Sequence, residues 1–163
     1  MWIVRMEHSP LRALLYLAPY QLNAVFTLTF MTPLYKSRAF EVWAPFIARL
    51  IFGLQFLVGA LFKIVGHAGE VAQSAAVGIP LPEVAVWLAF IFELVAGVCL
   101  IIGYRTRDVA FILALYVLLL ALLFYRHVSD PMVMGMFISH LGFIAGLLYV
   151  SVYGAKDIAV QKD

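Results

Sequence analysis

Four long apolar runs, separated by polar links, make up most of the chain after residue 41. A helix that crosses a bilayer needs about 20 predominantly apolar residues. The runs at Val42–Val65, Glu83–Gly103, Asp108–Tyr125 and Pro131–Tyr153 are long enough. Two of the links between them hold only a handful of residues, which makes successive helices antiparallel. The pattern therefore predicts an all-α fold, a membrane-embedded antiparallel four-helix bundle.

Residues that favour helix ends stand at the borders of these runs. Asp130 and Thr106 are predicted N-caps, because their side-chain oxygens can accept hydrogen bonds from a first helical turn. Gly103 and Gly154 are predicted C-terminal stops, since glycine readily adopts the left-handed conformation found there. The longest link, residues 66–83, is expected to hold a short interfacial helix.

Residues 1–40 form an extra N-terminal apolar segment that fits the pattern less well, because it also contains Gln21 and other polar residues. Two interpretations have equal weight: a loosely packed interfacial helix, or a start site placed too early, with Met31 as the natural start. A fifth span is less favoured. The expected organisation is an N-terminal segment at residues 1–40, a four-span domain at 41–155 and a cytoplasmic tail at 156–163.

The composition places the chain among membrane proteins. Hydrophobic residues make up 65% of it and charged residues 12%, whereas soluble domains are near half apolar and a quarter charged. The net charge of +2 comes from scattered basic residues, which argues against a nucleic-acid partner. The single cysteine, Cys99, excludes an internal disulfide and a cysteine-ligated metal site within this chain. We therefore expect an integral membrane protein whose main contact is the lipid bilayer.

Basic residues near the ends of the spans predict the orientation, because Lys and Arg collect on the cytoplasmic side. One side carries only Lys63 and Arg126. The other side carries Lys36, Arg38, Arg105, Arg107, Lys156 and Lys162. Both ends of the four-span unit are therefore expected in the cytoplasm, with the chain as a multi-pass protein of the inner (plasma) membrane.

Each predicted span places one hydrogen-bonding side chain near the middle of the bilayer. At about 1.5 Å per residue, Glu93 lies about 15 Å and His140 about 13 Å from the same membrane side. Tyr116 and Gln55 come out at a similar level. Ionisable residues in a membrane face the bundle interior and pair with one another. We expect Glu93 to pair with His140, either as a neutral acid bonded to the imidazole or as an ion pair.

Two interpretations of this polar midplane cluster compete. In the functional one, it passes protons or holds the polar headgroup of a quinone. In the structural one, four mutually satisfied side chains hold the helices in register. The four histidines have no common metal-ligand spacing, and no nucleotide-binding or hydrolase motif is present. The sequence therefore predicts no metal site, shows no self-contained catalytic motif and leaves the catalytic residues unknown.

Small residues predict where helices approach closely. The last span carries a stripe of Gly135, Ser139, Gly142 and Gly146, and Gly97 lies one turn after Glu93 on the second span. Arg49, Lys63 and Arg107 are cationic positions near helix ends. Arg49 and Lys63 are expected to extend toward water, or alternatively to frame the two mouths of a polar interior.

Four segments of the sequence resemble the DoxX family of small four-helix membrane proteins, and they occur in the family's order. They are "ARLIFGLQFLVGALFKI" (Ala48–Ile64), "GIPLPE" (Gly78–Glu83), "ELVAGVCLIIGYRTR" (Glu93–Arg107) and "LGFIAGLLY" (Leu141–Tyr149). The resemblance implies a four-span topology with both ends inside. The resemblance also implies that certain positions match the family pattern. These are Arg49, the segment Gly59–Lys63, Glu93 with Gly97, Gly103, and the pair Thr106 and Arg107.

The resemblance implies a general class of function rather than one activity. The family takes its name from a subunit of an archaeal terminal-oxidase and thiosulfate:quinone oxidoreductase system. The resemblance implies an accessory or quinone-associated subunit with a redox-protein partner and an external electron carrier. A small-solute transporter or a membrane assembly scaffold is the alternative, and a homo-oligomer stays open. His140 departs from the family pattern, which commonly has Asn there.

Overall fold

The computed structural model describes residues 36–126 and 129–161. The chain divides into two compact units, Met1–Glu41 and Val42–Asp163, and the second unit contains nearly all of the described residues. The predictions of an interfacial helix and of a start at Met31 fall on residues 1–35, outside the described residues.

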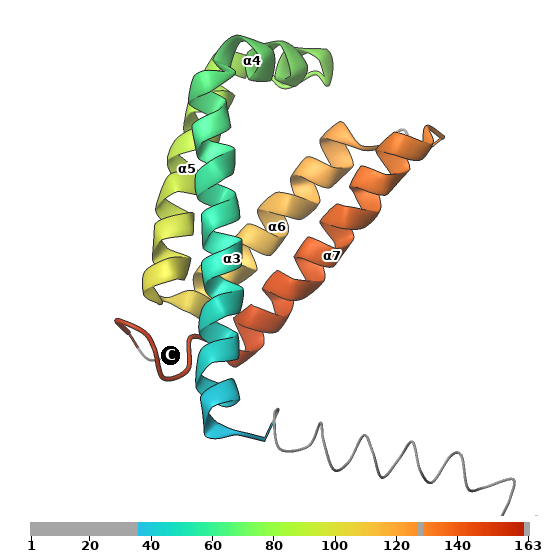
Figure 1. The fold of residues 1–163 in the computed structure, drawn as a ribbon. Helices are drawn as coiled ribbons and strands as arrows, with labels where there is room; N and C mark the ends of the chain where they lie inside the picture. Colours follow the sequence, from blue (N-terminus) through green and yellow to red (C-terminus); the bar gives the residue numbers. More distant parts are fainter. Residues whose placement is uncertain (1–35, 127–128, 162–163) are drawn as a thin grey trace, which may run out of the picture. The chain divides into compact units, whose positions relative to one another are not determined.

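Five helices make up the described chain, and no strand occurs in residues 36–126 or 129–161. The helices, labelled in Figure 1, are α3 (Arg38–Val65), α4 (His67–Ala76), α5 (Pro82–Ile102), α6 (Thr106–Phe124) and α7 (Pro131–Tyr153). All except α4 are long and apolar enough to cross a membrane. This confirms the predicted membrane-embedded helical bundle, and α4 is the short helix expected in the longest link.

Local residue chemistry accounts for most of the helix ends. The Asp130 carboxylate accepts a hydrogen bond from the backbone N–H of Met132 at 2.8 Å, so Asp130 caps α7 as predicted. Thr106 does not cap α6: Arg105 occupies the cap position with a φ of 44°, and Thr106 is the buried first residue of the helix. Gly103 and Gly154 have φ values of 74° and 71° and end α5 and α7, as predicted.

The long helices of the second unit form two pairs. In Figure 1, α3 and α5 run side by side, while α6 and α7 form a hairpin that diverges from them toward the end where α4 lies. We call this the α4 end, and the opposite end is the one where residues 103–105 join α5 to α6. The divergence leaves the α4 half of the bundle more open than the opposite half.

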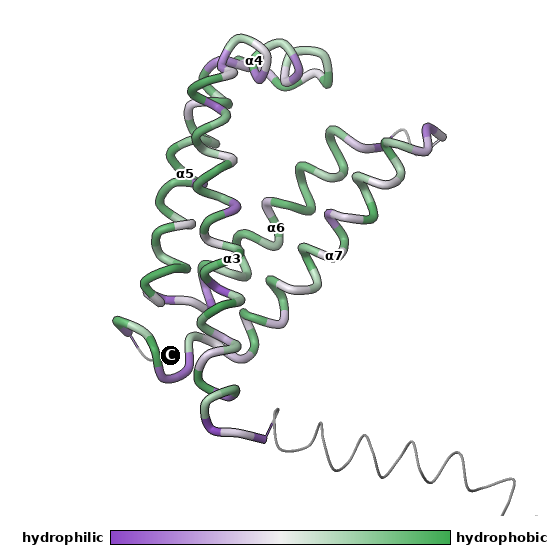
Figure 2. The backbone as a smooth tube through the Cα atoms, viewed as in Figure 1, coloured by the Kyte–Doolittle hydropathy of each residue, from purple (hydrophilic) through white to green (hydrophobic). Residues whose placement is uncertain are grey.

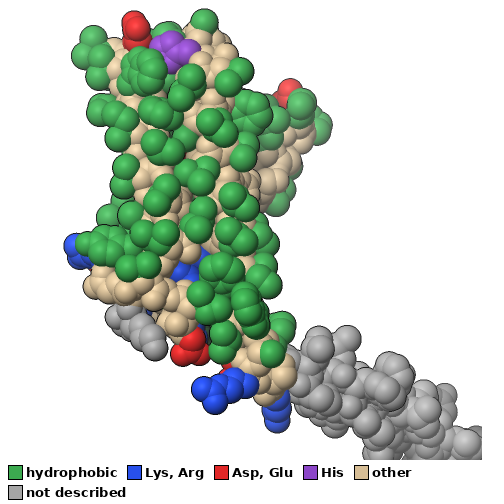
Figure 3. Space-filling view, turned by 60° about the vertical axis from the view of Figure 1, so that its left-hand side comes forward, with side chains coloured by type: hydrophobic (Ala, Val, Ile, Leu, Met, Phe, Trp, Pro, Cys, Tyr) green, Lys and Arg blue, Asp and Glu red, His purple; other side chains and the backbone are tan. Residues whose placement is uncertain are grey.

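The outer surface of the bundle is suited to lipid. Hydrophobic residues cover most of the length of the four long helices, with hydrophilic ones mainly at the links (Figure 2). Figure 3 shows that hydrophobic side chains also dominate one whole face of the molecule. Since a bilayer gives helices no hydrophobic drive to associate, close packing must hold the bundle together.

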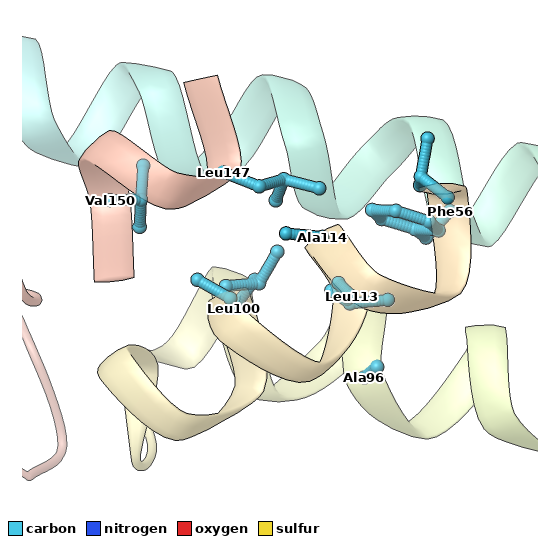
Figure 4. Packing of buried hydrophobic residues seen from close by; sticks show 9 residues of the cluster. Phe56, Ala96, Leu100, Leu113, Ala114, Leu147 and Val150 are labelled. Carbon is cyan, nitrogen blue, oxygen red and sulfur yellow. The ribbon is translucent and has the colours of Figure 1, made fainter. Parts of the chain in front are cut away.

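The buried core lies where the two helix pairs meet. Figure 4 shows that all four long helices contribute to it. Leu100 of α5, Leu113 of α6 and Leu147 of α7 are fully buried, and Phe56 of α3 is 7% exposed. Tyr116 of α6 packs against this core, so the core continues directly into the more polar part of the bundle.

Glycines allow α3 and α5 to approach closely. A Cβ atom on Gly97 would lie 2.9 Å from the carbonyl oxygen of Gly53, and one on Gly53 would lie 2.8 Å from the carbonyl oxygen of Gly97. Backbone atoms cannot move aside as a flexible side chain can. Only glycine at both positions therefore permits this crossing, which brings Glu93 of α5 next to α3.

Candidate functional site

The Glu93 carboxylate is the centre of a buried polar cluster. Glu93 is 4% exposed, within an apolar stretch of α5. The Lys63 ammonium group of α3 lies 2.9 Å from each of its two oxygens. The Tyr116 hydroxyl of α6 donates to Oε1 at 2.6 Å. Three helices therefore meet at one carboxylate, and we call these residues the Lys63–Glu93–Tyr116 cluster.

The structure corrects the expected pairing of Glu93 with His140. Nδ1 of His140 lies 2.8 Å from the carbonyl oxygen of Met136 on its own helix, and the ring contacts Tyr125 at 4.7 Å between centroids. Matching depth in the membrane does not bring two helices together, and α7 diverges from α5 in this half of the bundle (Figure 1). Lys63 reaches the carboxylate instead, because it stands on the adjacent helix.

The sequence did not predict Lys63 as the counter-ion of Glu93; it predicted for Lys63 a helix-end position that extends toward water or frames the mouth of a polar interior. Its side chain is only 14% exposed. The signal that indicates its role is Gly59, one turn earlier on α3. A Cβ on Gly59 would lie 2.9 Å from Oε2 of Glu93. Gly59 therefore leaves space for the carboxylate, and Lys63, one turn later on α3, supplies its counter-ion.

Two cavities flank the cluster. The first, of about 260 Å³, lies between α3, α6 and α7 and is lined by Gln55, Gly59, Glu93, Ser139 and His140 together with apolar residues. We call it the α7 cavity. The second, of about 530 Å³, lies beneath α4 and beside α6, and we call it the α4 cavity. Its polar lining includes Lys63, Glu70, Tyr116 and His140.

The two charges of the cluster open onto different cavities. Glu93 lines the α7 cavity, whereas Lys63 and Tyr116 line the α4 cavity. His140 and Leu120 line both. Each charge of the ion pair therefore lines a different cavity, and the two cavities also share a histidine.

Of the four residues expected in a midplane cluster, the structure brings only Glu93 and Tyr116 into direct contact. Gln55 is exposed on α3 and lines the α7 cavity without bonding to the carboxylate. His140 lines the same cavity. Because a carbonyl oxygen only accepts, Nδ1 of His140 carries a proton in its bond to Met136, and Nε2 is the second polar atom of the ring.

The electrostatics of the cluster favour an intact pair. A buried charge is costly in an apolar medium, and removing one partner of a buried pair costs about 3–5 kcal/mol. The Lys63 and Glu93 side chains are 14% and 5% exposed, so neither charge is well solvated. The short bond from the Tyr116 hydroxyl adds a third donor to the carboxylate.

Arg49 is fully inside the protein, contrary to the expectation that it extends to water. It is 1% exposed, and its guanidinium donates to the backbone carbonyl of Leu100 at 3.3 Å and to that of Ile158. The backbone N–H of Val160 donates to the carbonyl of Ile102 at 2.9 Å. Arg49 of α3 thus bonds to both the end of α5 and the C-terminal segment and holds the two together. Arg107 is exposed in the first turn of α6.

The small-residue stripe of α7 makes a close helix contact at one position. A Cβ on Gly146 would meet the Phe52 ring of α3, whereas nothing lies within 4 Å of a Cβ on Gly135 or Gly142. The Ser139 hydroxyl donates to the carbonyl of Gly135 at 2.9 Å and lines the α7 cavity. The stripe therefore faces open space in the half of α7 that diverges from the other helices.

Metal-ligating side chains are dispersed in the part of the chain that the structure describes. Within residues 36–126 and 129–161, no three His, Cys, Asp or Glu residues come together as a metal site. The Lys63–Glu93–Tyr116 cluster itself offers an ammonium, a carboxylate and a phenol group.

Comparison with known proteins identifies the family. The family model described as DoxX matches residues 44–126, which include all three residues of the Lys63–Glu93–Tyr116 cluster. The chain belongs to the DoxX family. The match ends before His140, so the histidine shared by the two cavities lies outside the matched range.

Curated relatives of this DoxX chain are named as inner membrane proteins. The inner membrane protein YqjF of Escherichia coli (strain K12) is 29% identical over 119 residues, which cover 71% of this chain and 88% of the relative. The inner membrane protein YphA of the same organism is 32% identical over 72 residues, 44% of this chain and 51% of the relative. No solved structure matches. The chain is thus an integral membrane protein of a family with inner-membrane members.

Proposed function

We propose that this DoxX-family protein is a quinone-associated subunit of a membrane redox system, in which the two cavities hold the polar headgroup. The observation that carries the proposal is the buried Lys63–Glu93–Tyr116 cluster with open space on both sides. A carboxylate kept inside apolar helices is costly, and such residues mark functional sites in membrane proteins. The cavities give this one access to a ligand.

The lining of the cavities suits an amphipathic ligand with a flat polar head. Lys63 has three N–H donors and uses two on Glu93, so one remains for a ligand carbonyl. The His140 imidazole, which lines both cavities, adds a polar ring nitrogen. The walls of the α4 cavity include Leu119, Leu123 and Phe124, which offer an apolar path for a tail. Its volume of about 530 Å³ is within the usual range of ligand pockets.

In this role the chain binds and orients the headgroup, while a partner protein exchanges electrons with it. Reduction of a quinone to a quinol takes up two electrons and two protons, and the electrons come from the partner. The distribution of Lys and Arg supports a cytoplasmic location for both ends of the four-span unit. One chain supplies the whole cluster, so the proposal requires no homo-oligomer.

The proposal is tested by photolabelling the full chain in lipid nanodiscs with an azidoquinone and competing with decylubiquinone. Leu120→Trp enlarges a side chain that lines both cavities and is expected to reduce the competable labelling at least tenfold. Leu122→Trp, on an exposed position of the same helix that lines neither cavity, is the control. Equal labelling of both variants, or labelling that decylubiquinone does not reduce, contradicts the proposal.

A further inference from the structure

The Lys63–Glu93 pair presents a cation to one cavity and a proton acceptor to the other. We infer that the protein binds an amphipathic organic anion on Lys63 together with a proton on Glu93. The inference rests on the proposed use of the two cavities as a ligand site, but it is independent of quinone as the ligand. It adds proton-coupled anion binding to the functions of this cluster.

Charge balance in an apolar environment couples the two events. The empty cluster is neutral, because the Lys63 ammonium and the Glu93 carboxylate compensate each other at 2.9 Å. An anion that enters alone leaves a net negative charge among apolar helices, which is strongly unfavourable. A proton on Glu93 restores neutrality and releases Lys63 to pair with the anion. Each anion is therefore expected to bind with one proton.

The hydrogen bonds of the cluster allow this exchange without moving a helix. The Tyr116 hydroxyl can still donate to Oε1 when the carboxyl group is protonated, since a carbonyl oxygen accepts as well. Oε2 lies beside Gly59, at the edge of the α7 cavity, where a proton can reach it. In the step itself, one O–H bond forms on Glu93 and the anion replaces the carboxylate as the counter-ion of Lys63. No electron moves.

Other titratable groups face the same space from each neighbouring helix. Glu70 of α4 lines the α4 cavity with Lys63, and its negative charge opposes an entering anion. His140 of α7 lines both cavities, and an imidazole can carry a proton between them. Apolar residues make up much of both linings. This composition favours anions with an alkyl or aromatic body over small hydrophilic ones.

The test uses octanesulfonate, which is ionised at all working pH values, so any proton taken up on binding must go to the protein. Titration calorimetry of the full chain in nanodiscs, in two buffers of different ionisation enthalpy, counts the protons, with empty nanodiscs as the blank. We expect uptake of about one proton per anion and, over the pH range in which that proton is taken up, an affinity that falls about tenfold per unit of rising pH. Octanol, the uncharged control, should bind without proton uptake.

Two variants separate the roles of the acidic groups. Glu93→Gln is expected to bind octanesulfonate without proton uptake and with an affinity independent of pH, because the site already lacks the negative charge. Glu70→Gln is expected to bind it more tightly, with the proton count unchanged. If Glu93→Gln does not fold, infrared difference spectra of the wild-type protein serve instead, and a protonated-carboxyl band should grow when the anion binds.

The outcomes distinguish this inference from the proposed function. Octanesulfonate binding without proton uptake, or an absence of specific binding to the wild-type protein, overturns the inference, and competable quinone labelling would still support the quinone role. Proton-coupled binding of octanesulfonate without competable quinone labelling supports the inference and removes the quinone role.

Discussion

The ammonium group of Lys63 lies 2.9 Å from both carboxylate oxygens of Glu93, inside a bundle of apolar helices. The two residues stand on α3 and α5, which cross closely at Gly53 and Gly97. The pair therefore joins two helices, and each of its charges lines a different cavity. Its contributions to stability and to ligand binding can be measured separately.

Removing either charge alone should destabilise the protein more than removing both. Lys63→Met leaves the Glu93 carboxylate without its counter-ion, and Glu93→Met leaves the ammonium without one. Each is expected to lower the free energy of unfolding by about 3–5 kcal/mol, whereas the double variant recovers much of the loss, because apolar residues of similar size often replace a buried pair at little cost. Denaturation in mixed micelles measures the cycle, and strictly additive losses would show that the two charges are not coupled.

Gly59 should not tolerate even one methyl group. In Gly59→Ala the new Cβ lies 2.9 Å from Oε2 of Glu93, and the carboxylate cannot yield without stretching its bonds to Lys63 and Tyr116. We expect a loss of about 1–3 kcal/mol in unfolding free energy, as for other overpacked sites.

Gly135→Ala is the matched control for that substitution. The change is chemically the same and also lies within a membrane helix, but no atom lies within 4 Å of the new Cβ. Alanine favours a helix over glycine by up to about 1 kcal/mol, so the variant should be as stable as the wild type or slightly more stable. Equal losses at both positions would mean that contact with Glu93 is not the cause.

The hydroxyl of Tyr116 should stabilise the protein through its bond to Glu93. Tyr116→Phe removes the donor to Oε1 of Glu93 but keeps the edge contact with Phe92, whose ring centroid lies 4.9 Å away. Hydrogen bonds to charged groups contribute about 1.5–3 kcal/mol, and we expect a loss in this range by the same denaturation assay. Tyr149→Phe, at a residue 65% exposed, should change stability by less than about 0.5 kcal/mol. An unchanged stability of Tyr116→Phe would argue against the short bond.

Arg49 should control the order of the C-terminal segment. Arg49→Met removes the donors to Leu100 and Ile158, so amide hydrogen exchange at Val160, which bonds to Ile102, should accelerate at least tenfold. Arg49→Lys should restore little, because an ammonium group lacks the planar fork that reaches two carbonyl groups.

Arg105→Gln is the control for the C-terminal effect. It breaks the exposed ion pair with Asp108, whose side chains are 60% and 58% exposed, and such pairs contribute little. Exchange at Val160 should stay as in the wild type. Similar acceleration in the Arg49 and Arg105 variants would show that cationic charge at this end, rather than the bonds of Arg49, orders the segment.

The spans and most of their ends could be predicted from the sequence, because these features depend on nearby residues. The length of each apolar run determines whether a helix can cross the bilayer. Asp130 caps α7 through its own side chain, and Gly103 ends α5 through its own φ. At Thr106 the prediction failed, because Arg105 took the left-handed cap position instead.

The partners inside the bundle were decided by the tertiary structure alone. Depth along a helix is a local property, and it correctly placed Glu93 and Tyr116 at one level. Distance across the bundle is not local: it depends on the close crossing of α3 and α5 and on the divergence of α7. For this reason Glu93 bonds to Lys63 rather than to His140, and the histidine is left where two cavities meet.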